Sequence, residues 1–360
     1  MYKAKFFIDE YLKWLRFSLN PSQPMPVIQD WKGLYDFVNK QAILGICEPT
    51  RFSDSRPDID ILMDWIGFVQ QLRAQNEHLN RQIGKLSEKL TTAGFRFCIL
   101  KGQGNAFMYP EWNLRTPGDI DVWVDSDEQS LLDYVKSLFP EKKETFKHIT
   151  FPVFKDTVVD MHYTPLKFYC PKYNKRLQQW ILESKDEQMS HYIKLSKIES
   201  VIAIPTAEFN AIYQLGHIMT HLFSWGVGFR QLVDYYYVLN KLEGISSDNK
   251  QRIIEIWNSL GLLRLASAVM WIEHEILGLP ERMILIKPNE HYGKIVLADV
   301  LEGGNFGKYS EGYKYFSRSY IRRPYALCRL VKLCSLFPSE ALFRILIRSK
   351  ELIEKFLHIL

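Results

Sequence analysis

The sequence predicts an α+β fold in which a small mixed β-sheet lies between two helical regions. Apolar residues recur at the period of an α-helix through residues 1–93, and again through residues 176–360. Between them, residues 94–175 alternate short runs of β-branched and aromatic residues with turn residues. A chain of 360 residues exceeds what one hydrophobic core usually supports, so we expect these three stretches to form separate domains or subdomains.

The composition is that of a soluble globular protein, with 47% hydrophobic and 24% charged residues. The N-terminus lacks the apolar core of a signal peptide, and no apolar window is long enough to predict a membrane-spanning helix. The five cysteines are scattered and form no Cys-x-x-Cys pair, which disfavours a disulfide framework or a zinc knuckle. We therefore expect a protein of the reducing cytoplasm.

Charge is distributed unevenly along the chain. Residues 95–165 contain eight Lys and Arg against eleven Asp and Glu, whereas residues 311–360 contain ten against four. An acidic centre fits metal binding. The basic end fits contact with nucleic acid or a membrane surface, or a solvated helical face, and we prefer the last interpretation.

Three helical patterns precede the predicted sheet, over residues 6–15, 30–44 and 60–93. The third has the clearest apolar stripe, which consists of Leu72, Leu79, Ile83, Leu86 and Leu90. Gly94 is expected to end this helix in a left-handed conformation. The helix then leads directly into a strand over residues 95–100.

The central region predicts a strand, a Lys-Gly turn, a short helix from near Gly104, and a second strand that begins with Asp-x-Asp. Ser126 and Gln129 form a capping-box signature for a helix that ends near Phe139. Two further strands are predicted over residues 150–154 and 157–163.

Three carboxylates form the predicted catalytic and metal-binding centre. Asp119 and Asp121 are two residues apart on one strand, so their side chains share a face, and Asp160 lies on a later strand. If the two strands pair, all three carboxylates meet and a divalent cation would relieve their repulsion; Mg²⁺ or Mn²⁺ suits such oxygen ligands, and two ions are expected. The alternatives are a solvated strand end for Asp-x-Asp and a hydrogen bond to a loop for Asp160.

Lys101, Gly102 and Arg115 are the predicted nucleotide-binding residues. Gly102 allows the backbone to approach a phosphate closely, and the short helix after it would point free N–H groups at that phosphate. Lys101 would add a point charge and Arg115 a bidentate contact. Alternatively, Lys101 lies in a solvated turn and Arg115 forms a surface or structural salt bridge.

A helix that starts at Pro205, with Thr206 as its cap, is predicted to line an acceptor cleft. Its polar stripe consists of Asn210, Gln214, His217 and His221. The two histidines are four residues apart and would also suit a metal ion or an ordinary core. His162, Arg230 and the two histidines are the predicted cleft residues, although His162 alternatively packs in the core and Arg230 alternatively pairs with Asp234.

These motifs carry a resemblance to a known superfamily. The motif residues are Ile99-Leu100-Lys101-Gly102, Tyr109-Pro110, Arg115, Asp119-Ile120-Asp121 and Val159-Asp160-Met161-His162. They resemble the nucleotidyltransferase superfamily with the polymerase-beta-like fold and, within it, an uncharacterised bacterial family with a Leu-Lys-Gly turn. The resemblance implies a small mixed sheet flanked by helices, with metal at the three aspartates. One departure is that Lys101-Gly102 replaces the usual Gly-Ser of the phosphate turn.

We therefore hypothesise a metal-dependent nucleotidyltransferase, which moves a nucleoside monophosphate from a nucleoside triphosphate to a hydroxyl acceptor. Asp160 is the residue expected to help activate that hydroxyl. The acceptor is a small molecule or a macromolecule, and nucleic acid is less favoured because the central region is acidic. Two rival hypotheses are a catalytically silent module that binds a nucleotide or a partner, and a transferase that uses another phosphorylated donor.

Overall fold

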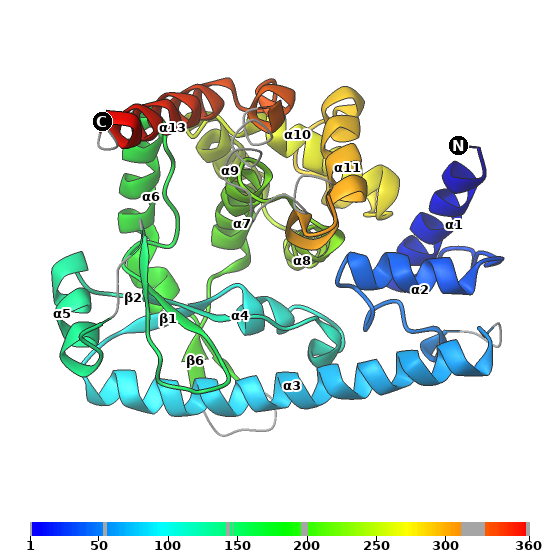
Figure 1. Ribbon diagram of the computed structural model, residues 1–360, viewed down its shortest axis with the longest axis horizontal. Helices are drawn as coiled ribbons and strands as arrows, with labels where there is room; N and C mark the ends of the chain where they lie inside the picture. Colours follow the sequence, from blue (N-terminus) through cyan, green and yellow to red (C-terminus); the bar gives the residue numbers. More distant parts are fainter. Residues whose placement is uncertain are drawn as a thin grey trace.

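The computed structural model describes residues 2–52, 56–141, 145, 147–195, 201–310 and 328–357. It confirms the predicted α+β class, with one four-stranded sheet surrounded by helices (Figure 1). The elements before the sheet and within it are α1 (Tyr2–Leu19), α2 (Trp31–Lys40), η1 (Pro49–Arg51), α3 (Ile59–Thr92), β1 (Phe97–Leu100), α4 (Gly102–Ala106), η2 (Trp112–Leu114), β2 (Ile120–Val124), α5 (Glu128–Leu138), β3 (His148–Thr150) and β4 (Val159–His162).

The sheet has the strand order β1-β2-β4-β3 and is mixed. Strand β2 pairs antiparallel with β1 and parallel with β4, and β3 pairs antiparallel with β4. In this register Asp121 lies beside Asp160, and Thr150 lies beside Asp160 on its other side. The pairing that the three-carboxylate hypothesis required is therefore present.

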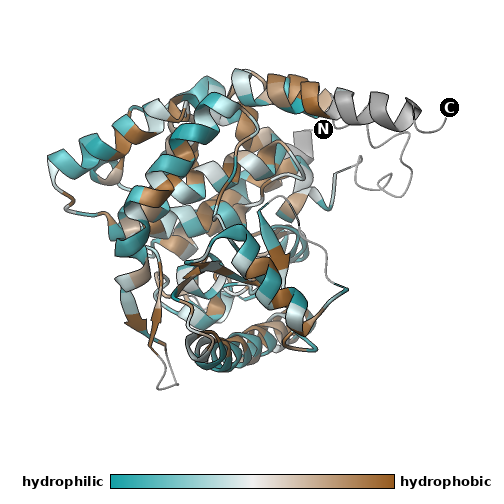
Figure 2. Ribbon diagram, turned by 90° about the vertical axis from the view of Figure 1, so that its left-hand side faces the viewer, coloured by the Kyte–Doolittle hydropathy of each residue, from teal (hydrophilic) through white to brown (hydrophobic). Residues whose placement is uncertain are grey.

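The two faces of the sheet differ in what covers them. Ile120, Val122 and Val124 of β2 belong to a hydrophobic core shared with α3 and α5. Figure 2 shows α3 nearly end-on beneath the sheet. Asp121 and Trp123 point to the opposite face, where the Trp123 ring lies 5.8 Å from that of Phe209 on the helical half. The alternation of β2 thus separates a purely apolar face from a face that carries the carboxylates.

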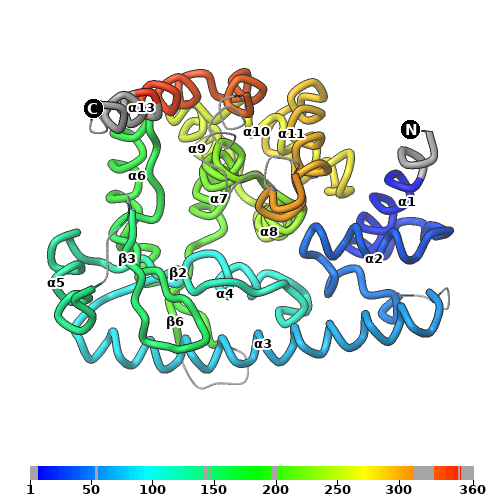
Figure 3. Tube along the Cα trace, viewed as in Figure 1, coloured from blue at the N-terminus to red at the C-terminus, as the bar shows by residue number. Residues whose placement is uncertain are grey.

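The elements after the sheet are mainly helical, as predicted. They are α6 (Pro171–Ser190), β5 (Tyr192–Lys194), β6 (Val201–Ala203), α7 (Ala207–Leu222), α8 (Phe229–Lys241), α9 (Ser247–Ser259), α10 (Leu263–Trp271), η3 (Ile272–Ile276, a π-helical turn), η4 (Glu281–Met283), α11 (Glu290–Gly303), η5 (Asn305–Gly307) and α13 (Pro338–Leu357). Figure 3 traces the chain from α3 at the base to α13 at the top. Thr206 caps α7 as expected, because its hydroxyl accepts from the Phe209 N–H at 3.2 Å.

The N-terminal helices share a core with the C-terminal half. The long helix ends at Thr92 and Gly94 has a φ of +81°, which confirms the expected left-handed end. The amide of Gln41, after α2, donates to the Val300 carbonyl at 3.0 Å, and Arg16 donates to the Ile276 carbonyl at 3.2 Å. Helix α1 and the end of α2 are therefore packed against segments more than 250 positions away in the sequence.

Three local predictions in and after the central region were wrong. Asp127, not Ser126, caps α5, because its carboxylate accepts from the Ser130 N–H at 2.9 Å. Strand β3 ends at Thr150 instead of beginning there, and the predicted run contains Pro152, which cannot donate to a sheet. The region predicted to be helical also contains the β5–β6 hairpin, whose three-residue strands are too short for a periodic signal.

The basic C-terminal segment, residues 311–360, is only partly within the described residues, because residues 311–327 and 358–360 lie outside them. Arg329 is buried and contacts Asp299 at 2.5 Å. The described part of the chain contains no helix with both the length and the apolar character needed to cross a bilayer. None of the five cysteines is in a disulfide.

Candidate active site

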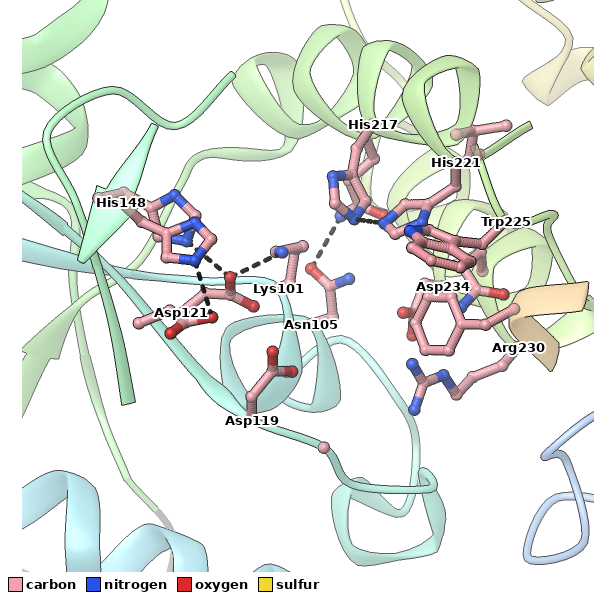
Figure 4. Close-up of a pocket in the computed structure, with 18 of the residues that line it drawn as sticks. Lys101, Asn105, Asp119, Asp121, His148, His217, His221, Trp225, Arg230 and Asp234 are labelled. Atoms are coloured by element: carbon pink, nitrogen blue, oxygen red, sulfur yellow. Dashed lines mark hydrogen bonds and ion pairs between the residues drawn. The ribbon is translucent and has the colours of Figure 1, made fainter. Parts of the chain in front are cut away.

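A cleft of about 320 Å³ opens between the carboxylate face of the sheet and the helical half (Figure 4). It brings together every residue predicted for the site, although the chain separates them by up to 129 positions. Those residues are Lys101, Gly102, Arg115, Asp119, Asp121, Asp160, His162, His217, His221 and Arg230. Gln214, from the predicted stripe, lines the cleft as well, and the structure adds Asn105, Lys147, His148, Trp225, Asp234 and Phe306.

Asp121 is the buried centre of the sheet side. One of its carboxylate oxygens lies 2.8 Å from Lys101 Nζ and 2.8 Å from His162 Nε2. Burial raises the pKa of Asp121, but Lys101 and His162 outweigh it, so that the pKa lies well below its usual range. An ionised carboxylate only accepts hydrogen bonds, so His162 donates through Nε2–H, while burial lowers the His162 pKa to about 3 and keeps the ring neutral.

Asp119 and Asp160 have different surroundings. Asp119 is exposed to the cleft, and the charge of Asp121, followed by burial, raises the Asp119 pKa. Asp160 accepts from the Thr150 hydroxyl at 2.8 Å, and His148 Nε2 lies 3.5 Å from its other oxygen. Asp119 and Asp121 are therefore the pair whose repulsion a cation would relieve.

The donor chemistry of these two carboxylates fits a hard divalent cation. Among the described residues, no three His, Cys, Asp or Glu side chains are already arranged as a metal site. Lys101 pairs with one oxygen of Asp121, and Asp160 contacts Thr150 and His148. Asp119 and the second oxygen of Asp121 would hold the ion.

The Lys-Gly turn has an unusual backbone. Lys101 has a φ of +44°, a conformation that residues with side chains rarely adopt, and Gly102 has a φ of +36°. Helix α4 begins at Gly102, slightly earlier than predicted. Strain of this kind persists only where the surroundings enforce it, and here it directs Lys101 at Asp121.

Arg115 forms a buried structural ion pair. Its Nε and Nη2 lie 2.7 and 2.8 Å from the two oxygens of Asp234, and the Tyr109 hydroxyl donates to the same carboxylate at 2.6 Å. Burial raises the pKa of Asp234, but the Arg115 charge and the hydrogen bonds from Arg115 and Tyr109 together outweigh burial and lower it, so the pair is ionised. The salt-bridge alternative for Arg115 is what the structure shows, and a phosphate contact by Arg115 would have to compete with Asp234.

Arg230 faces the cleft instead of pairing with Asp234. Its guanidinium lies 4.9 Å from the Phe306 ring, and Nη1 donates to the Pro117 carbonyl at 3.4 Å. Burial, followed by the nearby Arg115 charge, lowers the Arg230 pKa to about 10, which still leaves the side chain protonated at neutral pH. Arg230 is therefore a cation available to an anionic ligand.

Helix α7 forms a neutral wall opposite the carboxylates. Gln214 donates to the Asn105 side chain at 2.8 Å, and the Nε2 atoms of His217 and His221 lie 2.8 Å apart. Burial, followed by the Lys101 charge, lowers the pKa of both histidines. Asn210, the first member of the predicted stripe, is fully buried and does not line the cleft.

Sequence reasoning missed Lys147 and His148. Lys147 directly precedes β3 and His148 is its first residue, whereas the predicted strand began two residues later, at Thr150. In the observed register His148 lies opposite His162. With the strand placed correctly, the two-residue alternation would have put His148 and Thr150 on the face of Asp160. Burial, and then the Lys101 charge, lowers the Lys147 pKa to about 8.

Residues 28–278 match the model of an uncharacterised nucleotidyltransferase family. The chain belongs to this family. A solved structure of an antigenic nucleotidyltransferase-like protein from Paracoccidioides brasiliensis is 14% identical, with a TM-score of 0.32 over 51% of this chain and 93% of that chain. No curated protein matches the sequence.

Membership of the nucleotidyltransferase family supports nucleotidyl transfer as the general activity and a nucleotide as a substrate. The matched residues include the whole sheet, the Lys-Gly turn, and helices α7 and α8. Both walls of the cleft therefore lie within the family match.

Proposed function

We propose that this protein is a metal-dependent nucleotidyltransferase of the polymerase-beta-like superfamily. It transfers a nucleoside monophosphate from a nucleoside triphosphate to a hydroxyl group. The observation that carries the proposal is the pair of adjacent carboxylates, Asp119 and Asp121, in a cleft whose lining also contains the cationic side chains of Lys147 and Arg230.

Electrostatic balance supports the need for a metal ion. The cleft lining contains four cationic side chains, Lys101, Arg115, Lys147 and Arg230, and four carboxylates, Asp119, Asp121, Asp160 and Asp234. The lining is thus close to neutral, whereas a triphosphate is a polyanion. Divalent cations held by Asp119 and Asp121 would supply the missing positive charge and polarise the phosphate oxygens.

The phosphate contacts divide between two groups of residues. Lys101 is close enough to Asp121 to share its charge between that carboxylate and an arriving phosphate. Arg230 and Lys147 are further cations on the cleft, and we assign them to the phosphates with Lys101. Arg115 has a positioning role, because its ion pair with Asp234 holds in place the loop that leads to Asp119.

The reaction forms one bond and breaks one bond. The acceptor oxygen bonds to the α-phosphorus, the bond from that phosphorus to the bridging oxygen breaks, and pyrophosphate leaves with the electron pair. The hydroxyl proton passes to Asp160, which the Thr150 hydroxyl holds in place. The cleft brings these groups together, and positioning of this kind is a large part of catalysis in phosphoryl transfer.

Nucleotide binding tests the proposal directly. With Mg²⁺ or Mn²⁺ present, a nucleoside triphosphate at about 100 times its Kd should stabilise the fold by about 2.7 kcal/mol, measured by thermal unfolding. Mass spectrometry then detects a transferred nucleotide. The absence of stabilisation by every triphosphate would overturn the proposed donor, and stabilisation by another phosphorylated compound would favour the rival donor hypothesis.

The metal assignment has its own test. The double variant Asp119→Asn, Asp121→Asn should lose Mg²⁺-dependent triphosphate binding in calorimetry, because no carboxylate pair remains to hold the ion. Asp133→Asn is the control, since Asp133 is an exposed carboxylate on α5 that accepts a hydrogen bond from the Gln129 side chain and lies outside the cleft lining. Unchanged binding by the double variant would exclude these residues as the metal site.

A further inference from the structure

One end of the cleft is aromatic. Trp225 and Phe306, here called the aromatic end, both line the cleft, and neither residue belongs to the hydrophobic cores of the described chain. Trp225 is 45% exposed and Phe306 is half-buried. Figure 4 shows Trp225 well separated from Asp121 and His148. Aromatic side chains that line a cleft instead of filling a core are typical of ligand-binding pockets.

The turn that carries Phe306 is strained and tightly packed. Phe306 has a φ of +56° and a ψ of +29°, a left-handed conformation that residues with a side chain rarely adopt. The neighbouring elements enforce it. A Cβ atom on Gly307 would overlap the carbonyl oxygen of Trp225, and the Gln231 amide of α8 donates to the Asn305 side chain at 3.1 Å. Strain of this kind is concentrated at functional sites, and here it keeps the Phe306 ring at the cleft.

Phe306 lies outside the part of the chain that matches the family. The match covers residues 28–278, which include Trp225 but neither α11 nor η5. The position of Phe306 depends instead on how η5 packs against α8 and the turn before it. The aromatic end is therefore completed by a segment that the family match does not include.

Arg230 connects the aromatic end to the charged part of the cleft. Its guanidinium lies 4.9 Å from the Phe306 ring, and its Nη1 donates at 3.4 Å to the carbonyl of Pro117, two residues before Asp119. One guanidinium group thus spans from the Phe306 ring to the loop that leads into the carboxylate pair. A nucleotide has its parts in the same order, with a planar base at one end, a sugar in the middle and phosphates at the other end.

The chemistry of the aromatic end favours a nucleobase over a phosphate. Lys101 pairs with Asp121 at 2.8 Å, and Lys147 lies close enough to both of them to interact with their charges. These two cations therefore serve the carboxylate end of the cleft. Aromatic faces attract other planar rings, and every nucleobase has a face that stacks on them.

We propose that Trp225 and Phe306 form the subsite for the nucleobase of the donor triphosphate. The base stacks on these side chains while the phosphates extend past Arg230 towards Asp119 and Asp121. The inference rests on the proposed nucleotidyl transfer and adds the residues that hold the base.

Calorimetry of the full chain with Mg²⁺ tests the proposal. Of ATP, GTP, CTP and UTP, the triphosphate that binds most tightly is compared with inorganic tripolyphosphate, which has no base. Phe306→Leu and Trp225→Leu should each weaken triphosphate binding by about 5- to 150-fold, the effect of one lost stacking contact, and leave tripolyphosphate binding unchanged. An unchanged triphosphate affinity in either variant, or an equal loss for both ligands, would overturn the proposal.

Three further variants separate stacking from the packing of the turn. Phe306→Tyr and Trp225→Phe keep an aromatic face and should bind the triphosphate as tightly as the unmodified protein does. Tyr309→Leu is the matched control, because Tyr309 is an exposed aromatic residue close to the same turn but outside the cleft lining. It should leave both affinities unchanged. Weaker triphosphate binding in any of these three variants would contradict the stacking role.

Nucleosides distinguish a failure of this inference from a failure of the proposed function. Adenosine, guanosine, cytidine and uridine have a base but no phosphate, so their binding does not depend on metal ions. At least one should bind the unmodified protein, bind more weakly to Phe306→Leu, and be displaced by its triphosphate. Failure of all four to bind would overturn the inference, and so would a nucleoside that binds together with the triphosphate, because the aromatic end would then hold the acceptor.

The two failures give different results. If a nucleoside depends on Phe306 for binding while no triphosphate binds, the proposed function fails and the base subsite stands. If a triphosphate binds Phe306→Leu as tightly as the unmodified protein, the base subsite fails and the proposed function stands.

Discussion

The two walls of the cleft differ in how they handle charge. The sheet wall carries Asp119, Asp121 and Asp160, and two of these carboxylates are bound by cations or hydrogen-bond donors. The α7 wall carries amides and neutral imidazoles whose buried polar atoms are partly unpaired. The comparison shows that the sheet concentrates charge for phosphate and metal chemistry, while the helix offers neutral hydrogen-bonding groups suited to recognition.

The largest expected effect comes from breaking the link between the two walls. Asp234→Asn leaves the buried Arg115 guanidinium without its counter-charge, which should cost about 3–5 kcal/mol of unfolding free energy. Urea unfolding measures this loss. Replacement of both partners, Arg115→Met with Asp234→Leu, should recover most of it because no charge then remains buried unpaired. A loss below about 1 kcal/mol in the single variant would show that the pair does not hold the walls together.

Lys101→Met tests the sheet wall. If Lys101 contacts phosphate, triphosphate affinity should fall by about 1.5–3 kcal/mol, the usual worth of a hydrogen bond to a charged group, while nucleoside affinity changes little. Calorimetry with both ligands gives the comparison. Equal losses of triphosphate and nucleoside affinity would contradict the phosphate role. If the variant binds Mg²⁺ more tightly and its triphosphate affinity is unchanged, Lys101 serves only as the counter-ion of Asp121.

Glu273, in the π-helical turn η3, provides a contrast to Asp234 within the helical half. It is fully buried, both carboxylate oxygens lack a partner among the described residues, and burial raises its pKa well above the usual value. Since the folded state holds this proton more tightly than the unfolded state does, stability should fall as the pH rises above about 4.3, the ordinary Glu pKa.

Glu273→Met removes this buried carboxyl group and should stabilise the protein by about 1–3 kcal/mol, with a larger gain at pH 8 than at pH 4.5. Urea unfolding at both pH values measures the difference. A gain that does not change with pH would mean that Glu273 titrates alike in the folded and unfolded states.

The smallest effect concerns α5, which covers the apolar face behind the sheet wall. Asp127→Ala removes the observed cap and should cost about 1 kcal/mol, whereas Ser126→Ala should change stability by less than about 0.5 kcal/mol. Thermal unfolding compares the two. Neither change should alter nucleotide affinity, because α5 does not line the cleft, and an altered affinity would show that the back of the sheet influences the carboxylate wall.

The sequence alone determined the features that depend on local spacing. The two-residue period of a strand put Asp119 and Asp121 on one side of β2, and the helical period put His217 beside His221. Both arrangements follow from backbone geometry, so neighbouring residues were enough to predict them. The motif spacing likewise indicated the family to which the chain belongs.

Only the tertiary structure decided which groups meet across the cleft. Arg115 and Asp234 are 119 positions apart, and their pairing turned a predicted phosphate ligand into a buried ion pair. The contacts of Lys101 with Asp121, and of His148 with Asp160, similarly depend on strand order and register. Local periodicity sets the direction of a side chain, but its partner is chosen by the packing of distant elements, because long-range contacts leave no fixed spacing in the sequence.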